Sequence, residues 1–180
     1  MGRVSRARAE ENRQRVVEVA ARLFRQRGVA GTGVADVMNE AGLTHGGFYR
    51  QFASKESLLA EAAGAAIEGQ GERLAAMARE SAGRDEARRR LIETFLSPAH
   101  RDEAAEGCPL TALATDVGRE DPASPVRDRY ADGVEAFAHW LGDDLVTLST
   151  LIGALTLARA TSGTELSDRI LVQAAAALKE

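Results

Sequence analysis

With 180 residues, the chain is long enough for one domain, or for a small domain joined to a larger one. Cys108 is its single cysteine, which excludes an intrachain disulfide bond and a zinc site built from several cysteines. No apolar run approaches the length of a membrane span, and the basic N-terminus is not followed by the apolar segment of a signal peptide. We therefore expect a cytoplasmic protein with no membrane partner.

The charges of the chain are unevenly distributed. The net charge is −4, which taken alone argues against binding to nucleic acid. Residues 1–56 nevertheless contain 10 Lys and Arg against 6 Asp and Glu, a net charge of +4, whereas residues 57–180 contain 13 against 21, a net charge of −8. Because local positive potential is what attracts phosphates, the N-terminal third is the candidate for contact with DNA.

Apolar residues follow a helical period along the whole chain, and no stretch alternates as a strand would. We predict an all-α fold whose first helix ends at Gly28. Pro98 is expected to end a later helix, and the acidic stretch from there to Glu106 is predicted to be a loop. The predicted helices cover residues 10–27, 34–41, 44–52, 55–81, 85–97, 109–117, 124–141, 145–161 and 166–179.

Two short helices joined by a tight turn are predicted in residues 33–52. Apolar residues from Val34 to Ala41 share one helical face. Gly42 follows at the position where a helix commonly stops in the left-handed conformation, and Thr44 is a good N-cap for the second helix. This arrangement is the helix-turn-helix, whose second helix is sized for the major groove of DNA.

An ordered run of residues extends this motif: Ala41-Gly42-Leu43-Thr44, Gly47-Phe48-Tyr49, Phe52, Ser54-Lys55-Glu56 and Leu58-Leu59. At these spacings the run resembles the signature of the tetracycline-repressor (TetR) family of one-component transcriptional regulators. The resemblance implies a three-helix DNA-binding domain in residues 1–54 and a helical ligand-binding and dimerisation domain in residues 55–180. The chain departs from the family at Gly33, where Ser or Thr is usual. Since Gly is an acceptable cap and Thr32 is adjacent, we expect the helix start to shift by one residue.

The resemblance also implies which side chains contact DNA. Thr44, Tyr49 and Lys55 match positions that hold phosphates in the family. His45 and Arg50 have the reach to touch base edges, and Arg is the commonest reader of guanine. A surface ion pair is the alternative role for Arg50.

Gly46 and Gly47 are poor helix residues, each costing about 1 kcal/mol relative to Ala. Their lack of a side chain lets the backbone approach the duplex, which gives a functional reason for their presence. Thr32, beside the cap of the first motif helix, is a further DNA-binding candidate. Phe48 and Phe52 are spaced four residues apart and are expected in the core rather than at the DNA.

A small apolar or aromatic effector is expected to bind among the helices of residues 85–160. This part of the chain carries more aromatic residues on predicted inner faces than a minimal dimerisation stalk would need. The long helix from Lys55 ties it to the DNA-binding domain. The candidate ligand-binding residues are Phe95, Cys108, Leu113, Phe137, Trp140, Leu155 and Arg159.

Two of these residues allow alternative interpretations. Cys108 lies in Gly107-Cys108-Pro109-Leu110, which resembles a segment of the multidrug- and flavonoid-responsive branch of the family. It is either a small buried hydrophobe or a redox-sensing thiolate at a helix N-terminus, and no basic or second thiol partner lies nearby in sequence. Arg159 interrupts an apolar run and either pairs with a carboxylate of a neighbouring helix or anchors an anionic effector.

The last two predicted helices are apolar over a wide arc and must therefore bury two faces. One face can pack on its own domain, and the simplest partner for the other is the same helix pair of a second subunit. The family resemblance implies the same four-helix interface of a homodimer, although the connection from Gly142 to Leu145 is short for the family. The candidate interface residues are Leu148, Ile152, Ile170 and Ala174.

Enzyme, metal and cofactor functions find no support in the sequence, which lacks a P-loop, a G-x-S-x-G, an H-E-x-x-H and a dinucleotide glycine pattern. His100, His139 and Cys108 fit no short metal-ligand motif. We predict a regulator that binds an inverted-repeat operator in double-stranded DNA as a homodimer, most simply a repressor that an effector releases. A helical adaptor without DNA binding, and a DNA-binding regulator without a ligand, are the alternatives.

Overall fold

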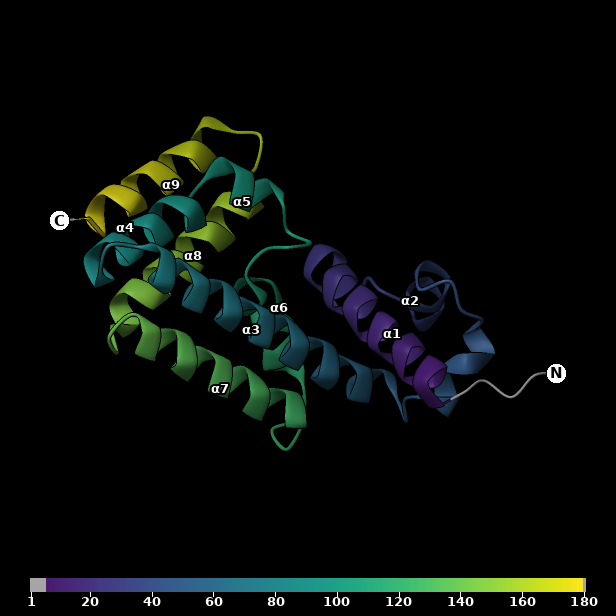
Figure 1. Cartoon of the computed structure of the whole chain (residues 1–180). Coiled ribbons are helices and arrows are strands. Elements are labelled where there is room, and N and C mark those ends of the chain that lie inside the picture. Colours follow the sequence, from purple (N-terminus) through teal and green to yellow (C-terminus); the bar gives the residue numbers. More distant parts are fainter. Residues whose placement is uncertain (1–5, 180) are drawn as a thin grey trace.

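Every regular element in residues 6–179, the part of the chain that the computed structural model describes, is a helix (Figure 1). The predicted all-α fold is therefore confirmed. The elements are α1 (Arg6–Arg27), α2 (Val34–Glu40), the 3₁₀ helix η1 (His45–Arg50), α3 (Lys55–Glu80), α4 (Arg84–Phe95), α5 (Pro98–Asp102), α6 (Pro109–Arg119), α7 (Pro125–Trp140), α8 (Leu145–Ala160) and α9 (Glu165–Ala177).

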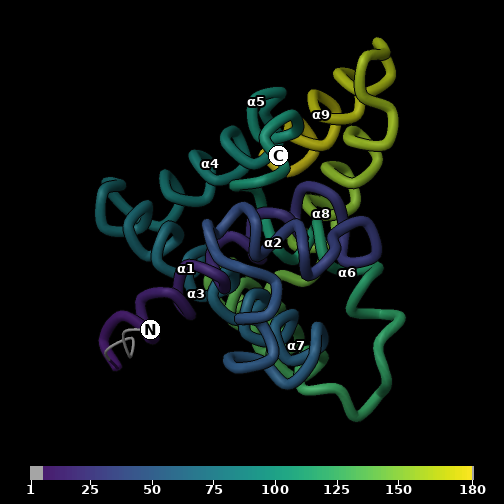
Figure 2. The backbone as a smooth tube through the Cα atoms, turned by 90° about the vertical axis from the view of Figure 1, so that its right-hand side faces the viewer, coloured from purple at the N-terminus to yellow at the C-terminus, as the bar shows by residue number. Residues whose placement is uncertain are grey.

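The long helix α3 connects two groups of helices (Figures 1 and 2). The head, residues 6–54, packs on the first half of α3, and the remaining helices, which we call the body, surround its second half. Helix α7 runs parallel to α3 at close range. A Cβ added to Gly133 would lie 2.8 Å from the side chain of Ile67, so only glycine allows this approach. Further along, Trp140 Nε1 donates to the carbonyl of Leu74 at 3.1 Å.

The core has two clusters, one centred on the head and one in the body, and Tyr130 packs against both. The head cluster does not stop at residue 54. It includes the first turns of α3, and also Leu113 and Val117 of α6. The stripe of α1 that fills it, Val16, Ala20, Leu23 and Phe24, is almost fully buried. Head and body are thus packed together through α3 and α6.

The predicted loop after Pro98 is wrong, because this segment forms the short helix α5. Ser97 caps the helix, its hydroxyl accepting from the N–H of His100 at 3.1 Å. Pro98 occupies the first helical position, where its missing N–H costs nothing and its fixed φ favours the helix. The proline therefore begins a helix as well as ending α4.

The short connection before α8 is closed by left-handed residues and a strong cap. Gly142 and Asp143 have φ of 83° and 65°. Asp144 then accepts from the N–H and the hydroxyl of Thr147 at 2.9 and 2.6 Å, and from Arg88 at 3.1 Å. The Thr147 and Arg88 hydrogen bonds lower the pKa of Asp144 to about 2. This cap fixes the start of α8.

Replacing Asp144 by Ala is expected to destabilise the fold by about 1 kcal/mol at neutral pH, as is typical for loss of an N-cap. Because the pKa is depressed in the folded state, the contribution is present above the unfolded value of about 3.9 and is lost as the pH falls through about 2. Urea denaturation of both proteins should show their difference narrowing below about pH 4. The exposed Glu135→Ala on α7 is the control, with an effect under about 0.5 kcal/mol. An unchanged stability in Asp144→Ala would contradict the cap.

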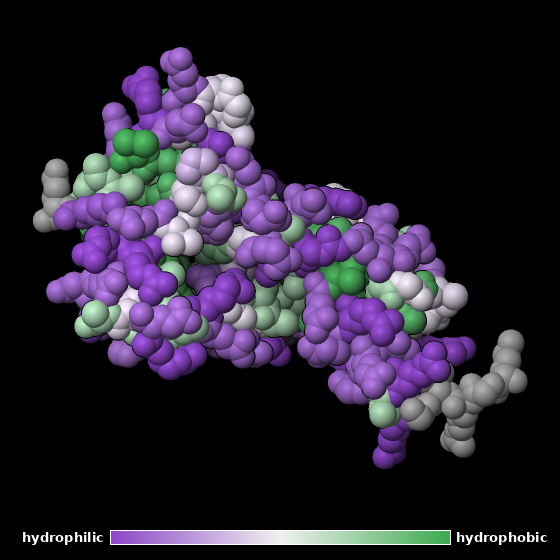
Figure 3. Space-filling model, turned by 45° about the horizontal axis from the view of Figure 1, so that its top comes forward, coloured by the Kyte–Doolittle hydropathy of each residue, from purple (hydrophilic) through white to green (hydrophobic). Residues whose placement is uncertain are grey.

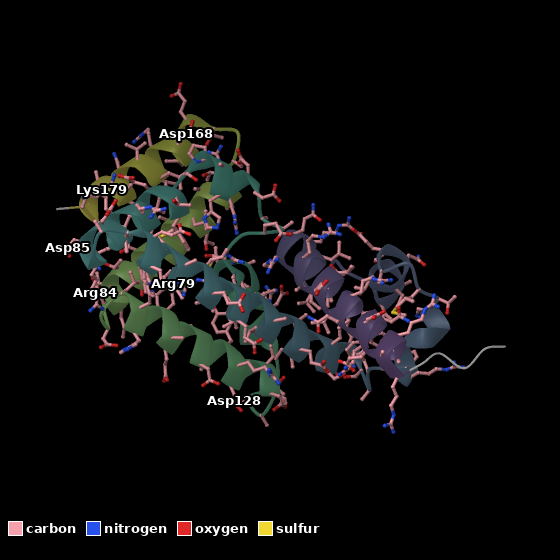
Figure 4. The ribbon with its side chains drawn as sticks, viewed as in Figure 1. Arg79, Arg84, Asp85, Asp128, Asp168 and Lys179 are labelled. Carbon is pink, nitrogen blue, oxygen red and sulfur yellow. The ribbon has the colours of Figure 1, made fainter. Side chains whose placement is uncertain are left out.

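Asp168 of α9 and Lys179, both labelled in Figure 4, connect the C-terminal helix to α5 and α4. Asp168 accepts from Arg101 of α5 at 2.7 Å, and Lys179, just beyond α9, donates to Glu93 of α4 at 2.9 Å.

No single helix among residues 6–179 combines the length and apolar character needed to cross a membrane. Only α7 and α8 taken together meet that test, and they are bent by 115° relative to each other.

Candidate DNA-binding surface and effector cavities

The turn between α2 and η1 is closed by backbone hydrogen bonds. The N–H of Leu43 donates to the carbonyl of Met38 at 2.8 Å, and that of Gly42 to the carbonyl of Asn39 at 3.0 Å. This pair is the Schellman pattern, which needs a left-handed residue at the position of Gly42, whose φ is 71°. Leu43 packs against the head cluster. The turn therefore has the structure that the sequence predicts.

Gly33 is the N-cap of α2, which begins at Val34, so the expected one-residue shift of the helix start does not occur. The backbone N–H of Gly33 donates to the carboxylate of Asp36 at 2.8 Å. Asp36 thus supplies half of a capping box and a negative charge where the helix dipole favours one. The family's usual hydroxyl is absent, but the helix start stays in place.

Thr32 is fully buried, which contradicts its prediction as a DNA contact. Its hydroxyl donates to the carbonyl of Gly28 at 2.9 Å. It thereby satisfies an acceptor at the end of α1 that the helix itself leaves unpaired. Thr32 positions the link from α1 to α2 and has no surface to offer a phosphate.

The second motif helix, predicted over residues 44–52, is shorter and tighter than expected, a 3₁₀ helix from His45 to Arg50. Two consecutive glycines disfavour a longer α-helix here. Phe48 and Phe52 are buried beneath it, with ring centroids 5.4 Å apart, which confirms their prediction as core residues. A Cβ added to Gly46 would meet no atom within 4 Å, so the space in front of this residue is open.

The outer side of η1 presents a row of exposed side chains. Thr44, His45 and Arg50 are exposed, as is Tyr49, whose side chain is 68% accessible despite its ring contacts with His45 and Phe48. The Thr44 hydroxyl caps no backbone group. Within the described part of the chain no acidic residue pairs with Arg50, so its alternative role in an ion pair finds no support. Gly47 is half-buried and faces Met38 of α2.

Lys55 lies at the start of α3 and already has a protein partner. Its ammonium donates to the carbonyl of Val29 at 2.5 Å. The N–H of the same residue, Val29, donates to Asp116 of α6 at 3.2 Å. The peptide groups of this α1–α2 link are therefore held from both α3 and the body. An ammonium has three donors, which leaves two on Lys55 for a phosphate.

Arg13 is a positioning residue that the sequence did not single out. Its guanidinium donates to the backbone carbonyl of Gln51 at 2.5 Å and to both oxygens of Glu61 at 2.6 and 2.7 Å. It also lies 4.3 Å from the centre of the Phe52 ring. Arg13 thus fixes the end of η1 to α1 and α3. The only signal in the sequence for this role is the position of Arg13 on the polar side of α1.

The single predicted effector pocket is divided in two. One cavity, the α3–α4 cavity, has a volume of about 250 Å³ and is lined by Phe95 and Cys108 among others. The other, the α3–α7 cavity, has about 120 Å³ and is lined by Phe137 and Trp140. Gln70 and Leu74 of α3 line both and separate them. Sequence periodicity could not reveal this, because it does not show how far α3 enters between α4 and α7.

Leu113, Leu155 and Arg159 line neither of these two cavities, so their predicted ligand contacts gain no support from them. Leu113 is buried in the head cluster, and Leu155 is 0% exposed in the body cluster. Arg159 donates to the backbone carbonyls of His100 and Arg101 at 3.0 and 3.1 Å. Its partner is therefore the end of α5, where the helix dipole favours a cation, and not the carboxylate that was expected.

Cys108 is a buried residue in the wall of the α3–α4 cavity. Its thiol donates to Gln70 Oε1 at 3.4 Å, and burial raises the pKa of the Cys108 thiol. A raised pKa favours a small buried hydrophobe and opposes a reactive thiolate. The backbone N–H of Cys108 donates to His100 Nε2 at 3.2 Å, while His100 Nδ1 is 2.8 Å from the carbonyl of Phe95. Burial lowers the pKa of His100. His139 lies elsewhere, exposed beside Asp143.

The four residues predicted at the dimer interface differ in how deeply they are buried. Leu148 is only 3% exposed because it packs within its own body cluster, so it offers almost no surface to a second subunit, contrary to its prediction as an interface residue. Ile152, Ile170 and Ala174 are half-buried against the same cluster. Apolar atoms nevertheless appear on the surface near the C-terminal end (Figure 3). The large exposed apolar residues of α8 and α9 are Leu145, Val146, Leu157, Leu166 and Val172.

Comparison with known proteins places this geometry in a family. Residues 16–62 match the bacterial regulatory proteins of the tetR family. The HTH-type transcriptional regulator Rv0196 of Mycobacterium tuberculosis is 33% identical over 168 residues, which cover 82% of this chain and 84% of that protein. AcrR of Shigella flexneri is 39% identical over 61 residues, 34% of this chain and 28% of its own length. The reduced form of E. coli NemR has the same fold, with a TM-score of 0.79 at 18% identity over 94% of this chain and 95% of that structure.

The mycobacterial similarity covers 82% of this chain, while the family match covers the helix-turn-helix. Both support a regulator of transcription and not an adaptor without DNA binding. Relatives of this kind are regulators, not enzymes, and they bind DNA operators as dimers. The chain belongs to the TetR family of bacterial transcriptional regulators.

Proposed function

We propose that the protein is a homodimeric repressor that binds an inverted-repeat operator and is released by a small, mainly apolar effector. The observation that carries the proposal is the row of exposed side chains on η1, held over the buried pair Phe48 and Phe52. Thr44 and Tyr49 would donate to phosphates, and His45 and Arg50 would reach base edges. Lys55 would use its remaining donors on the backbone at the edge of this surface.

The exposed apolar residues of α8 and α9 support a dimer through these helices. Val146, Leu157 and Val172 have 76%, 58% and 67% of their surface exposed in the single chain. Gly153 has open space in front of it on the same side of α8. A second copy of the helix pair would bury this face and set two heads at the spacing of successive major grooves, about 34–36 Å.

The two cavities support an effector site in the body. The α3–α4 cavity is the larger and contacts α3, α4 and the segment that leads into α6. Helices α3 and α6 both continue to the head, where Lys55 and Asp116 hold the peptide groups of Val29. An effector that favours another arrangement of these helices would shift the population of dimers away from the DNA-binding form.

Tyr49→Ala is expected to weaken operator binding while the protein remains folded. A lost phosphate contact should lower the slope of log K against log salt concentration by about one. Fluorescence anisotropy with operator fragments selected from genomic DNA, at several salt concentrations, measures both quantities. The matched control is Ala131→Glu on the exposed side of α7, which should change neither. Equal affinity and slope in Tyr49→Ala and the unmodified protein would contradict the proposed surface.

A further inference from the structure

A cleft of about 390 Å³ lies between α1 and α3, where the head meets the body. We call it the α1–α3 cleft. Arg22 and Arg25 of α1 and Arg73 of α3 line it together with Glu18 and Glu106. Arg73 and Glu106 also line the α3–α4 cavity, so the charged cleft and the apolar cavity adjoin at these two side chains.

Glu106, the acidic residue that lines both the cleft and the cavity, is already neutralised. Glu106 lies 3.6 Å from Arg25, whose side chain is only 8% exposed and which also donates to the carbonyl of Ala105 at 2.7 Å. Arg22 pairs with Glu40. For Arg73, residues 6–179 provide no acidic partner. Glu18 accepts from Gln14 at 3.3 Å and does not line the cavity, so the uncompensated charge shared by cleft and cavity is that of Arg73.

The guanidinium of Arg73 is directed into the cleft. A Cβ added to Gly69, which lines the cleft, would lie 3.6 Å from Arg73 Nη1. Burial lowers the pKa of Arg25 and of His100, and the charge of Arg73 lowers both further. Arg73 itself lines both the cleft and the cavity, so it is a cation that the two spaces share.

We propose that the cleft and the cavity form one composite site for a small anionic amphiphile, whose apolar body fills the α3–α4 cavity and whose acid group binds Arg73. The cavity is lined by apolar side chains, including Leu74, Met77, Leu91 and Phe95. An apolar cavity of about 150 Å³ holds benzene, so 250 Å³ accommodates a ring with a short chain. A carboxylate at the boundary of this cavity would lie beside Arg73, which lines both spaces.

This inference rests on the proposed function and names the chemical class of its effector. The acid group would lie beside the Arg25–Glu106 pair, which joins α1 to the segment before α6. An added anion competes with Glu106 for the arginines and loosens that link. Binding at this place would therefore alter the contacts of α1, the helix against which the DNA-binding surface packs.

Three probes share the same apolar body and differ in the charge of the head group: 3-phenylpropanoate, 3-phenylpropan-1-ol and 3-phenylpropylammonium. Titration calorimetry with the full chain should show the acid binding about tenfold more tightly than the alcohol, and the amine most weakly. Added salt should weaken only the acid, since Arg73 is exposed. Tightest binding of the amine would assign the site to Glu106 and overturn the proposal, as would equal binding of all three or no binding of the acid at millimolar concentration.

Arg73→Gln should remove the tenfold advantage of the acid and leave the alcohol unchanged, and Arg73→Glu should make the amine the tightest probe. Arg79→Gln is the matched control. Arg79 lies on the same helix (Figure 4) and lines neither the α1–α3 cleft nor the α3–α4 cavity. A retained preference for the acid in Arg73→Gln overturns the proposal. If the acid binds as described but operator affinity stays unchanged, the proposed release by an effector fails and the composite site stands. If instead only a neutral compound releases the DNA, the composite site fails and the release stands.

Discussion

Replacing Gly46 by Leu is expected to abolish operator binding in a protein that folds normally. The position of its Cβ is open, with no atom within 4 Å, and its φ is not left-handed, so the side chain enters no other part of the protein. It would stand among Thr44, His45 and Arg50, on the face that meets the duplex. Lifting η1 out of the groove removes several contacts worth about 1–3 kcal/mol each, so the affinity should fall about 100-fold or more.

Gly118→Leu provides the control for this experiment. Gly118 is also exposed with open space in front of it, but it lies near the end of α6 and outside the DNA-binding surface. Both variants should keep the thermal unfolding temperature of the unmodified protein, and only Gly46→Leu should lose binding in the anisotropy assay. Full operator affinity in Gly46→Leu would show that this face of η1 does not meet DNA.

The features that sequence reasoning predicted well depend on neighbours in the chain. The turn at Gly42 follows from the backbone preference of one residue, and the burial of Phe48 and Phe52 follows from helical spacing. The helix bounds agree to within a few residues because caps and glycines mark them locally. These signals need no knowledge of what packs against the segment.

The features that it missed depend on contacts between distant segments. Thr32 is buried because the end of α1 needs its hydroxyl, and Arg159 meets carbonyls of α5, a helix that was not predicted. The division of the effector pocket by Gln70 results from the depth at which α3 packs between α4 and α7. Leu148 has the same apolar character as Leu157, and only the packing of α8 decides which of them faces inward.

The second large effect is expected at the dimer surface. Val172→Glu and Leu157→Glu should each convert the dimer to a monomer, because a carboxylate buried without a partner costs several kcal/mol. Both positions are exposed in the single chain, so neither substitution should disturb the fold. Glutamate at Ile152 or Ala174 would test this less well, since both residues also pack on the body cluster.

Sedimentation velocity of both variants, with Ala131→Glu on α7 as the control, measures the state of assembly. A monomer presents one head where the operator offers two half-sites, so operator affinity should fall together with the dimer. Together, the state of assembly and the operator affinity test two points separately: where the dimer interface lies, and whether binding needs two heads. Dimers that persist in both variants would place the interface away from the outer face of α8 and α9, whereas monomers that bind the operator as tightly as the unmodified protein would show that one head is sufficient.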